Sequence, residues 1–316
     1  MRSTSLELSG ARILELRPPK PPVDPWKPHA FFVEPECNSA GAVEDVATLF
    51  LTNRECPFRC LMCDLWKYTT DERVPIGAIP AQIDHALSRL PTARHLKLYN
   101  AGNFFDAQAI PPADHERIAE QIAAFHTVIV ECHPLLIGER CIAFRDRIRP
   151  ALQIAMGLET VHPDVLRRLN KGMTTADFAR ATRFLADNGI GIRAFILLKP
   201  PYLDEGEGVE WARRSIDFAF ENGVECCSII PTRAGNGAME RLADNGDFSP
   251  PRLESLEQVM EYGLSRRHGR VFADLWDVEK FYDCANCGPR RTARLSTMNL
   301  TQTLPPQVVC NCREIA

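Results

Sequence analysis

The sequence lacks the features that would direct it to a membrane, to a secretory route or to nucleic acid. It has no apolar stretch long enough to cross a bilayer and no secretory signal region followed by a cleavage site. Its 37 lysines and arginines against 41 aspartates and glutamates give a net charge of −4, so it has no general basic field. We therefore expect no membrane partner. Hydrophobic residues at 45% indicate a globular protein, and 316 residues are enough for one large α/β domain or two ordinary domains.

Cysteine, by contrast, is abundant, with twelve residues in the chain. Seven of them form groups with the spacing of metal sites. The other five are scattered, and we interpret them as buried small side chains: Cys37, Cys132, Cys141, Cys226 and Cys227. Thiols that bind metals must stay reduced, so we expect a cytoplasmic location.

Three cysteines lie close together in a C-x3-C-x2-C pattern, directly after the apolar residues 46–51. They are Cys56, Cys60 and Cys63. Soft thiolate ligands suit iron, and a short loop lets all three point toward one iron–sulfur cluster. A cubane cluster has four irons, so one iron would stay open for a small-molecule ligand. A structural zinc site is the competing interpretation, but it would need a fourth ligand nearby and more often uses paired C-x2-C motifs.

Strand-like and helix-like segments alternate from residue 46 onward. We predict six strands, over residues 46–53, 94–100, 126–131, 152–158, 191–198 and 225–231. Helical patterns between them predict parallel βαβ units with right-handed crossovers. We therefore expect an α/β protein built on a partial (β/α)6 TIM-like barrel. An open doubly wound sheet is the alternative, which the strand count does not exclude.

The segments on either side of this barrel differ from it in character. Residues 1–45 are interpreted as a proline-rich arm, because five prolines between residues 18 and 25 disfavour a continuous helix. Residues 46–235 would form the barrel. Residues 236–316 are interpreted as a C-terminal extension with a cysteine-rich tail, packed on the barrel rather than folded as a separate large domain.

Polar residues follow the predicted strands where a parallel barrel carries its active site, at the carboxyl ends. Asn100, Ala101 and Gly102 follow the second strand, and Gly102 permits close approach of a ligand to the backbone. Glu131 ends the third strand, where its carboxylate could contact a ligand or pair with an arginine. His133 is interpreted as a structural hydrogen-bonding residue.

The cysteine loop resembles that of the radical S-adenosylmethionine (SAM) superfamily. The segment from Gly157 to Gly172 is similar to the strand-four signature of its Elongator-like group and of the oxygen-independent coproporphyrinogen oxidases. Residues 229–240 and 246–251 resemble the radical SAM subunit of archaeosine synthase, which acts on a modified guanine in tRNA, and its bacterial relatives. The resemblance covers about residues 46–240.

This resemblance implies the cofactors and their ligands. The three cysteines of the loop would hold a [4Fe–4S] cluster, SAM would bind its open iron, and an electron donor such as flavodoxin or ferredoxin would reduce it. The segment after the second strand would hold the amino group of SAM, and Glu131 would contact the ligand. Glu159 could bind the ribose hydroxyls and Lys171 the carboxylate, although the family often has arginine at that position. Met62 could pack its thioether against the adenine.

A second group of cysteines lies near the C-terminus. A C-x2-C pair is followed, after 22 residues, by a C-x-C pair: Cys284, Cys287, Cys310 and Cys312. These four thiols could bind zinc or another structural metal, hold an auxiliary iron–sulfur cluster, or bind no metal.

Three functions agree with these patterns. The first is a radical SAM enzyme that abstracts hydrogen from a small molecule or biosynthetic intermediate. The second is modification of a tRNA nucleoside, as the archaeosine-type resemblance implies, although the negative net charge offers tRNA no general attraction. The third is a non-catalytic iron–sulfur protein that binds or senses a ligand.

Overall fold

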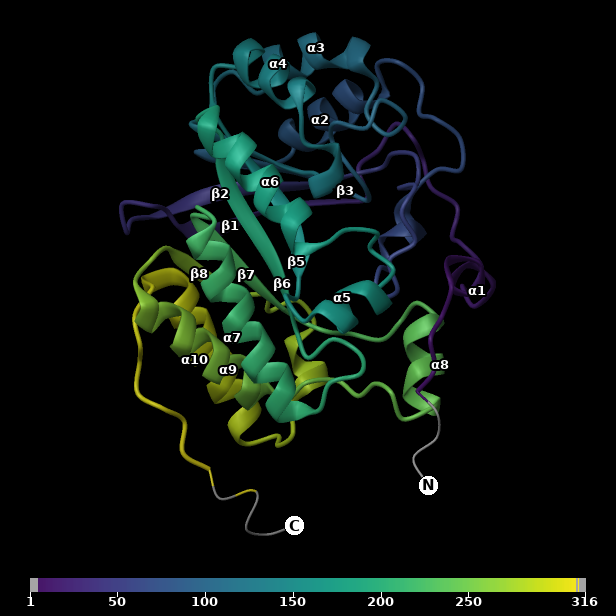
Figure 1. Ribbon diagram of the computed structural model, residues 1–316. Helices are drawn as coiled ribbons and strands as arrows, with labels where there is room; N and C mark the ends of the chain where they lie inside the picture. The colour runs from purple at the N-terminus through teal and green to yellow at the C-terminus, as the bar shows by residue number, and fades with distance from the viewer. Residues whose placement is uncertain (1–4, 311, 313–316) are drawn as a thin grey trace.

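The computed structural model describes residues 5–310 and residue 312. One eight-stranded sheet forms its centre, and the strands lie side by side in sequence order (Figure 1). The strands are β1 (Ala30–Cys37), β2 (Val43–Leu51), β3 (His95–Asn100), β4 (Thr127–Glu131), β5 (Ala151–Glu159), β6 (Gly191–Leu198), β7 (Cys226–Pro231) and β8 (Arg270–Ala273). β1 is antiparallel to β2, and every later pair is parallel.

The α-helices are α1 (Gly10–Glu15), α2 (Ala78–Leu87), α3 (His115–Gln121), α4 (Glu139–Arg147), α5 (Pro163–Arg168), α6 (Thr175–Asp187), α7 (Glu205–Glu221), α8 (Ala238–Asp244), α9 (Leu253–Arg266) and α10 (Cys287–Thr301). Helices α2 to α9 lie between the parallel strands, α1 precedes β1 and α10 follows β8. α2, α3 and α4 lie toward one end of the sheet, and α7, α9 and α10 lie toward the other (Figure 1). No helix in the described ranges is both long and apolar enough to span a bilayer.

Alternate residues of the strands face opposite sides of the sheet. Leu96 and Leu98 of β3, like Ile192 and Ile196 of β6, are buried in the large apolar cluster that the helices share. The intervening residues therefore point to the other, inner face, because successive side chains of a strand alternate. Several inner-face residues are polar or aromatic, such as Lys97 and Tyr99 of β3 and Arg193 and Phe195 of β6, which makes this face suitable for a ligand.

Buried charges fill the amino-terminal half of the inner face. Lys97 of β3 lies 2.7 Å from a Glu36 carboxylate oxygen and 2.9 Å from Glu34, and Arg193 of β6 pairs with Glu36 as well. Burial raises the pKa of Glu36, but Arg193 and Lys97 outweigh it and hold that pKa well below its usual value. These ion pairs link β1, β3 and β6 across the inner face, so the carboxyl half remains for ligands.

The expected α/β fold with a partial TIM-like barrel and a cysteine-rich C-terminal extension is confirmed. The six predicted strands are β2 to β7, with ends that differ by at most three residues from those observed. The two further strands, β1 and β8, lie outside residues 46–235. β1 contains Pro35 and is an edge strand, a position that tolerates proline, while β8 has only four residues.

A second apolar cluster lies at the carboxyl ends of the strands. Leu8 and Ile13 from the N-terminal segment pack there with Leu61, Leu169 and Met239. Figure 1 shows α1 beside α8 on the same side of the molecule. The N-terminal segment thus covers the loop that holds the first three cysteines.

Candidate active site at the carboxyl ends of the strands

The loop with Cys56, Cys60 and Cys63 follows β2 and is held by hydrogen bonds from distant segments. The Leu61 backbone N–H donates to the Leu169 carbonyl at 2.8 Å, and the Asn170 amide donates to the Arg59 carbonyl at 2.6 Å. From the start of α8, the Asn236 amide donates to the carbonyls of Leu61 and Cys63, at 2.8 and 3.1 Å. Hydrogen bonds from residues 169–170 and from Asn236 therefore hold residues 59–63 of the loop in place.

The three thiols are free and lie in a poorly solvated place. Burial raises the pKa of Cys60 to about 11 and that of Cys63 to about 12, and it also raises the pKa of Cys56. The thiols add to this effect, because a charge on one disfavours a charge on the next. Thiols that resist ionisation alone become thiolates when a cation displaces their protons, which is the behaviour of metal ligands.

The segment after β3 lies against this loop. A methyl group on Gly102 would contact the Cys56 Cβ at 3.4 Å and the Asn53 amide nitrogen at 3.5 Å, and the φ of Gly102 is 157°. The Asn103 amide donates to the Cys56 sulfur at 3.4 Å. Glycine at position 102 therefore keeps the backbone of residues 100–103 close to the first cysteine.

Buried polar atoms without partners lie beside the cysteine loop. Neither the nitrogen nor the oxygen of the Asn100 amide has a hydrogen-bond partner among the described residues, and the Asn53 amide oxygen has none either. Leaving a buried polar group unpaired costs about 1–3 kcal/mol, so such groups usually have a ligand, a water or a functional role. These amides fit a polar ligand beside the loop.

Glu131, at the end of β4, holds the segment after β3 in place. Its carboxylate accepts a hydrogen bond from the Asn100 backbone N–H at 3.2 Å, and its carbonyl accepts one from the Phe104 N–H at 2.8 Å. Burial raises the pKa of Glu131 to about 8, although the Asn100 N–H and the Lys171 charge oppose this rise. Glu131 positions the segment that the resemblance assigns to SAM, and its direct contact with a ligand stays a prediction.

Glu159 and Lys171 form a buried ion pair beyond β5, with 2.5 Å between Lys171 Nζ and Glu159 Oε1. Glu159 has a φ of 64°, which is unusual for a residue with a side chain, and the pairing of β5 with β6 shifts between Gly157 and Glu159. A methyl group on Gly157 would overlap both charged groups. Gly157 therefore leaves the space in which the pair sits.

His133 and Asn103 connect the parts of the site. The Leu135 N–H donates to His133 Nδ1, so Nε2 carries the hydrogen and donates to the Lys171 carbonyl at 3.1 Å. The His133 ring stacks on Phe58 of the cysteine loop, with 3.8 Å between ring centroids, and its backbone N–H donates to the Asn103 side-chain oxygen at 2.6 Å. Burial and the nearby Lys171 lower the pKa of His133 to about 3, so it stays neutral and structural, as the sequence predicts.

The structure thus brings Asn100, Gly102, Glu131, Glu159 and Lys171 to the same edge of the sheet as the cysteine loop. Met62 is half-buried and packs on the second apolar cluster, and its contact with adenine stays a prediction. The four terminal cysteines form a separate group at the start of α10. Asn53, Gly157 and Asn236 also belong to this site, although their positions in the sequence did not indicate a role, and Asn236 acts through contacts distant in the chain.

The chain is similar in sequence to several archaeal proteins. No protein-family model matches the chain. It is 23% identical to an uncharacterised protein of Methanocaldococcus jannaschii, over 92% of this chain and 86% of that protein. It is 29% identical to the archaeosine synthase subunit beta of Thermococcus kodakarensis, over 64% of this chain and 65% of the relative. For the same subunit of Methanosarcina acetivorans the identity is 26%, over 81% and 78%.

Among solved structures, the archaeal Elp3 of Methanocaldococcus infernus matches with a TM-score of 0.53 at 15% identity, over 80% of this chain and 63% of that chain. The chain and Elp3 share a fold, and the cysteine loop follows the first parallel strand of the sheet. The chain spans less than two thirds of the Elp3 chain and of the Thermococcus relative, so each extends beyond the matched part.

Proposed function

We propose that this protein is a radical SAM enzyme, which cleaves SAM reductively and abstracts a hydrogen atom from a small molecule or biosynthetic intermediate. One observation supports the proposal: the three-cysteine loop, two buried amides and a buried ion pair lie together at the ends of β2 to β5. The amides are those of Asn53 and Asn100, which have atoms without a hydrogen-bond partner among the described residues, and the ion pair is Glu159–Lys171. Cluster ligands, amide groups for an amino acid and a carboxylate for a ribose are therefore available at one edge.

In this proposal the chain supplies ligands and orientation. Cys56, Cys60 and Cys63 would hold a [4Fe–4S] cluster, which would supply the electron for reductive cleavage of SAM. Lys171 meets the SAM carboxylate and Glu159 accepts hydrogen bonds from the ribose. Since these two side chains bond to each other, SAM would take over part of an existing pair rather than meet two unpaired charges.

Aromatic side chains on the inner face would contact the substrate. The rings of Phe50, Tyr99 and Phe195 come from β2, β3 and β6, and 6.0 Å separates the centroids of Phe50 and Tyr99, as it does those of Tyr99 and Phe195. Burial raises the pKa of Tyr99 to about 12, so its hydroxyl stays neutral. An aromatic, poorly hydrated wall suits a planar group and keeps water from a reactive radical.

Reductive SAM cleavage tests this function. We expect the anaerobically reconstituted, reduced protein to release 5′-deoxyadenosine and methionine in equal amounts, with dithionite or flavodoxin as the electron donor. Chromatography of the products measures both. A protein that carries four irons and binds SAM but releases neither product would contradict the proposal and favour a sensing role.

The second candidate is modification of a tRNA nucleoside, which the similarity to two archaeosine synthase beta subunits supports. The small-molecule proposal predicts no binding of tRNA at physiological salt, in line with the net charge of −4. Filter binding with mixed tRNA at about 50 and about 200 mM salt distinguishes the two, because phosphate contacts weaken binding steeply as salt rises. Tight binding with a steep salt dependence would support the tRNA candidate instead.

A further inference from the structure

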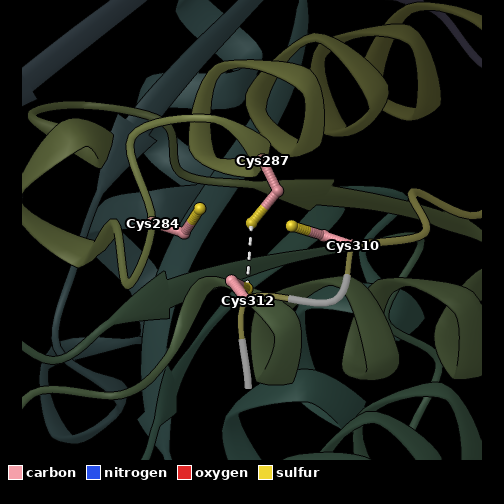
Figure 2. Close-up of side chains that lie close together, drawn as sticks. All are labelled: Cys284, Cys287, Cys310 and Cys312. Atoms are coloured by element: carbon pink, nitrogen blue, oxygen red, sulfur yellow. Dashed lines mark hydrogen bonds between the residues drawn. The ribbon is translucent and has the colours of Figure 1, made fainter. Parts of the chain in front are cut away.

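The four terminal cysteines meet in space although 22 residues separate the two pairs. Cys284 and Cys287 lie at the start of α10, while Cys310 and Cys312 lie in the segment that returns from its end. Their sulfur atoms all lie within 4.8 Å of one another, and Figure 2 shows them gathered in one place. Cys287 Sγ and Cys312 Sγ are 3.9 Å apart.

This spacing fits one metal ion. Zinc binds four thiolates tetrahedrally at about 2.3 Å, which places their sulfurs about 3.8 Å apart. A cubane cluster attaches each thiolate to a different iron and directs the thiolates away from one another, so its ligand sulfurs must lie farther apart than those on a single ion. In the described part of the chain no other group of three or more His, Cys, Asp or Glu ligands is as compact. The three cysteines of the loop with Cys56 do not meet this distance either.

A buried arginine holds the returning segment on α10. The Arg294 guanidinium pairs with Glu257 at 3.2 Å and with Glu261 at 2.7 Å, both from α9, and it donates to the carbonyls of Pro305 and Pro306, each at 2.9 Å. The segment therefore runs back along α10 toward its first turn. This path brings Cys310 and Cys312 next to Cys284 and Cys287.

Helix α10 in turn covers the free edge of β8. The Asn299 amide bonds to both the N–H and the carbonyl of Ala273, at 2.8 and 2.9 Å, and the Gln302 amide bonds to both groups of Val271, at 2.8 and 3.0 Å. An edge strand needs such cover because its backbone groups are otherwise unpaired. Directly after β8, Asp274 pairs with Arg233, which follows β7, at 2.8 Å.

We propose that Cys284, Cys287, Cys310 and Cys312 bind one zinc ion, and that this ion fastens α10 over β8. The ion ties both ends of the α10 hairpin together, and α10 completes the hydrogen bonding of the last strand. The site is structural and takes no part in electron transfer. The proposal does not depend on the function proposed above, since it concerns a different set of cysteines.

Metal analysis of the full chain tests the first half. We expect about one zinc and about four irons per reconstituted chain. The triple variant C56A/C60A/C63A is expected to lose the iron and keep the zinc, whereas C310S/C312S loses the zinc and keeps the iron. Cobalt in place of zinc should give the visible absorption of a tetrahedral thiolate site. About eight irons per chain in the wild type would overturn the single-ion assignment, even if a variant fails to fold.

Hydrogen exchange tests the second half. When a chelator removes the zinc, we expect the amides of Val271 and Ala273 to exchange at least tenfold faster, because Gln302 and Asn299 would no longer hold them. Amides in β3 and β4 serve as the internal control and should not change. Zinc loss with unchanged exchange in β8 would contradict the fastening role.

Discussion

Replacing Cys60 by Ala is expected to reduce SAM cleavage below detection and to prevent stable binding of four irons. The loop offers three ligands, and the loss of one leaves a second iron without a protein thiolate. Cys60 is the central ligand, in the part of the loop fixed by the bond between the Asn170 amide and the Arg59 carbonyl. No rearrangement of the loop backbone could therefore bring in another thiol easily.

Cys141→Ala is the matched control for this variant. Cys141 is fully buried in α4 within the large apolar cluster and belongs to neither cysteine group. The control should keep its iron and its cleavage activity, because it loses only a small buried side chain. Iron counting, electron paramagnetic resonance of the reduced protein and 5′-deoxyadenosine release are measured on both variants. Cleavage at the wild-type rate by the Cys60 variant would refute the proposed mechanism.

The part of the fold that could be predicted from the sequence is the part with strong local patterns. Residues 195–198 of β6 form a continuous apolar run, and two of the helices that follow strands, α6 and α7, are followed by glycine signals. β1 contains the sequence Glu34-Pro35-Glu36, which is typical of a solvent-exposed segment rather than of a strand. Only the structure reveals that both glutamates pair with Lys97 on the inner face. The charged residues that made β1 difficult to predict from the sequence are therefore the ones that bind β1 to β3.

The candidate site was predictable where position alone identifies residues, namely directly after each strand. The residues that were missed act across the chain. Asn236 bonds to the carbonyl of Cys63, 173 residues away, and Asn53 became notable only because its amide oxygen is buried without a partner among the described residues. Asn236 lies in the segment 229–240, where it fixes the cysteine loop and its side-chain oxygen accepts a hydrogen bond from the Met239 N–H in the first turn of α8. Local sequence patterns do not indicate which distant residues form hydrogen bonds with one another.

Replacing Lys171 by Ala is expected to lower the free energy of unfolding by about 3–5 kcal/mol and to abolish SAM binding. The variant leaves the Glu159 carboxylate buried without its partner, and an unpaired buried charge is costly. Burial by itself lowers the pKa of Lys171, but the charge and the hydrogen bond of Glu159, with smaller contributions from Cys60 and Cys56, outweigh it and raise that pKa, so the lysine is charged at neutral pH. Urea unfolding of the metal-free protein and calorimetry with SAM measure the two effects.

Two further variants separate the stabilising role of this pair from its role in binding. The double variant E159Q/K171M removes both charges and should recover most of the lost stability, because no buried charge remains unpaired. It should still bind SAM much more weakly, since the ammonium that would meet the SAM carboxylate and the ionised carboxylate that would accept both ribose hydroxyls are lost. K171R keeps the positive charge, and we expect it to retain binding. If the double variant bound SAM as tightly as the wild type, the pair would serve only to stabilise the end of β5, and the SAM carboxylate would have to bind elsewhere.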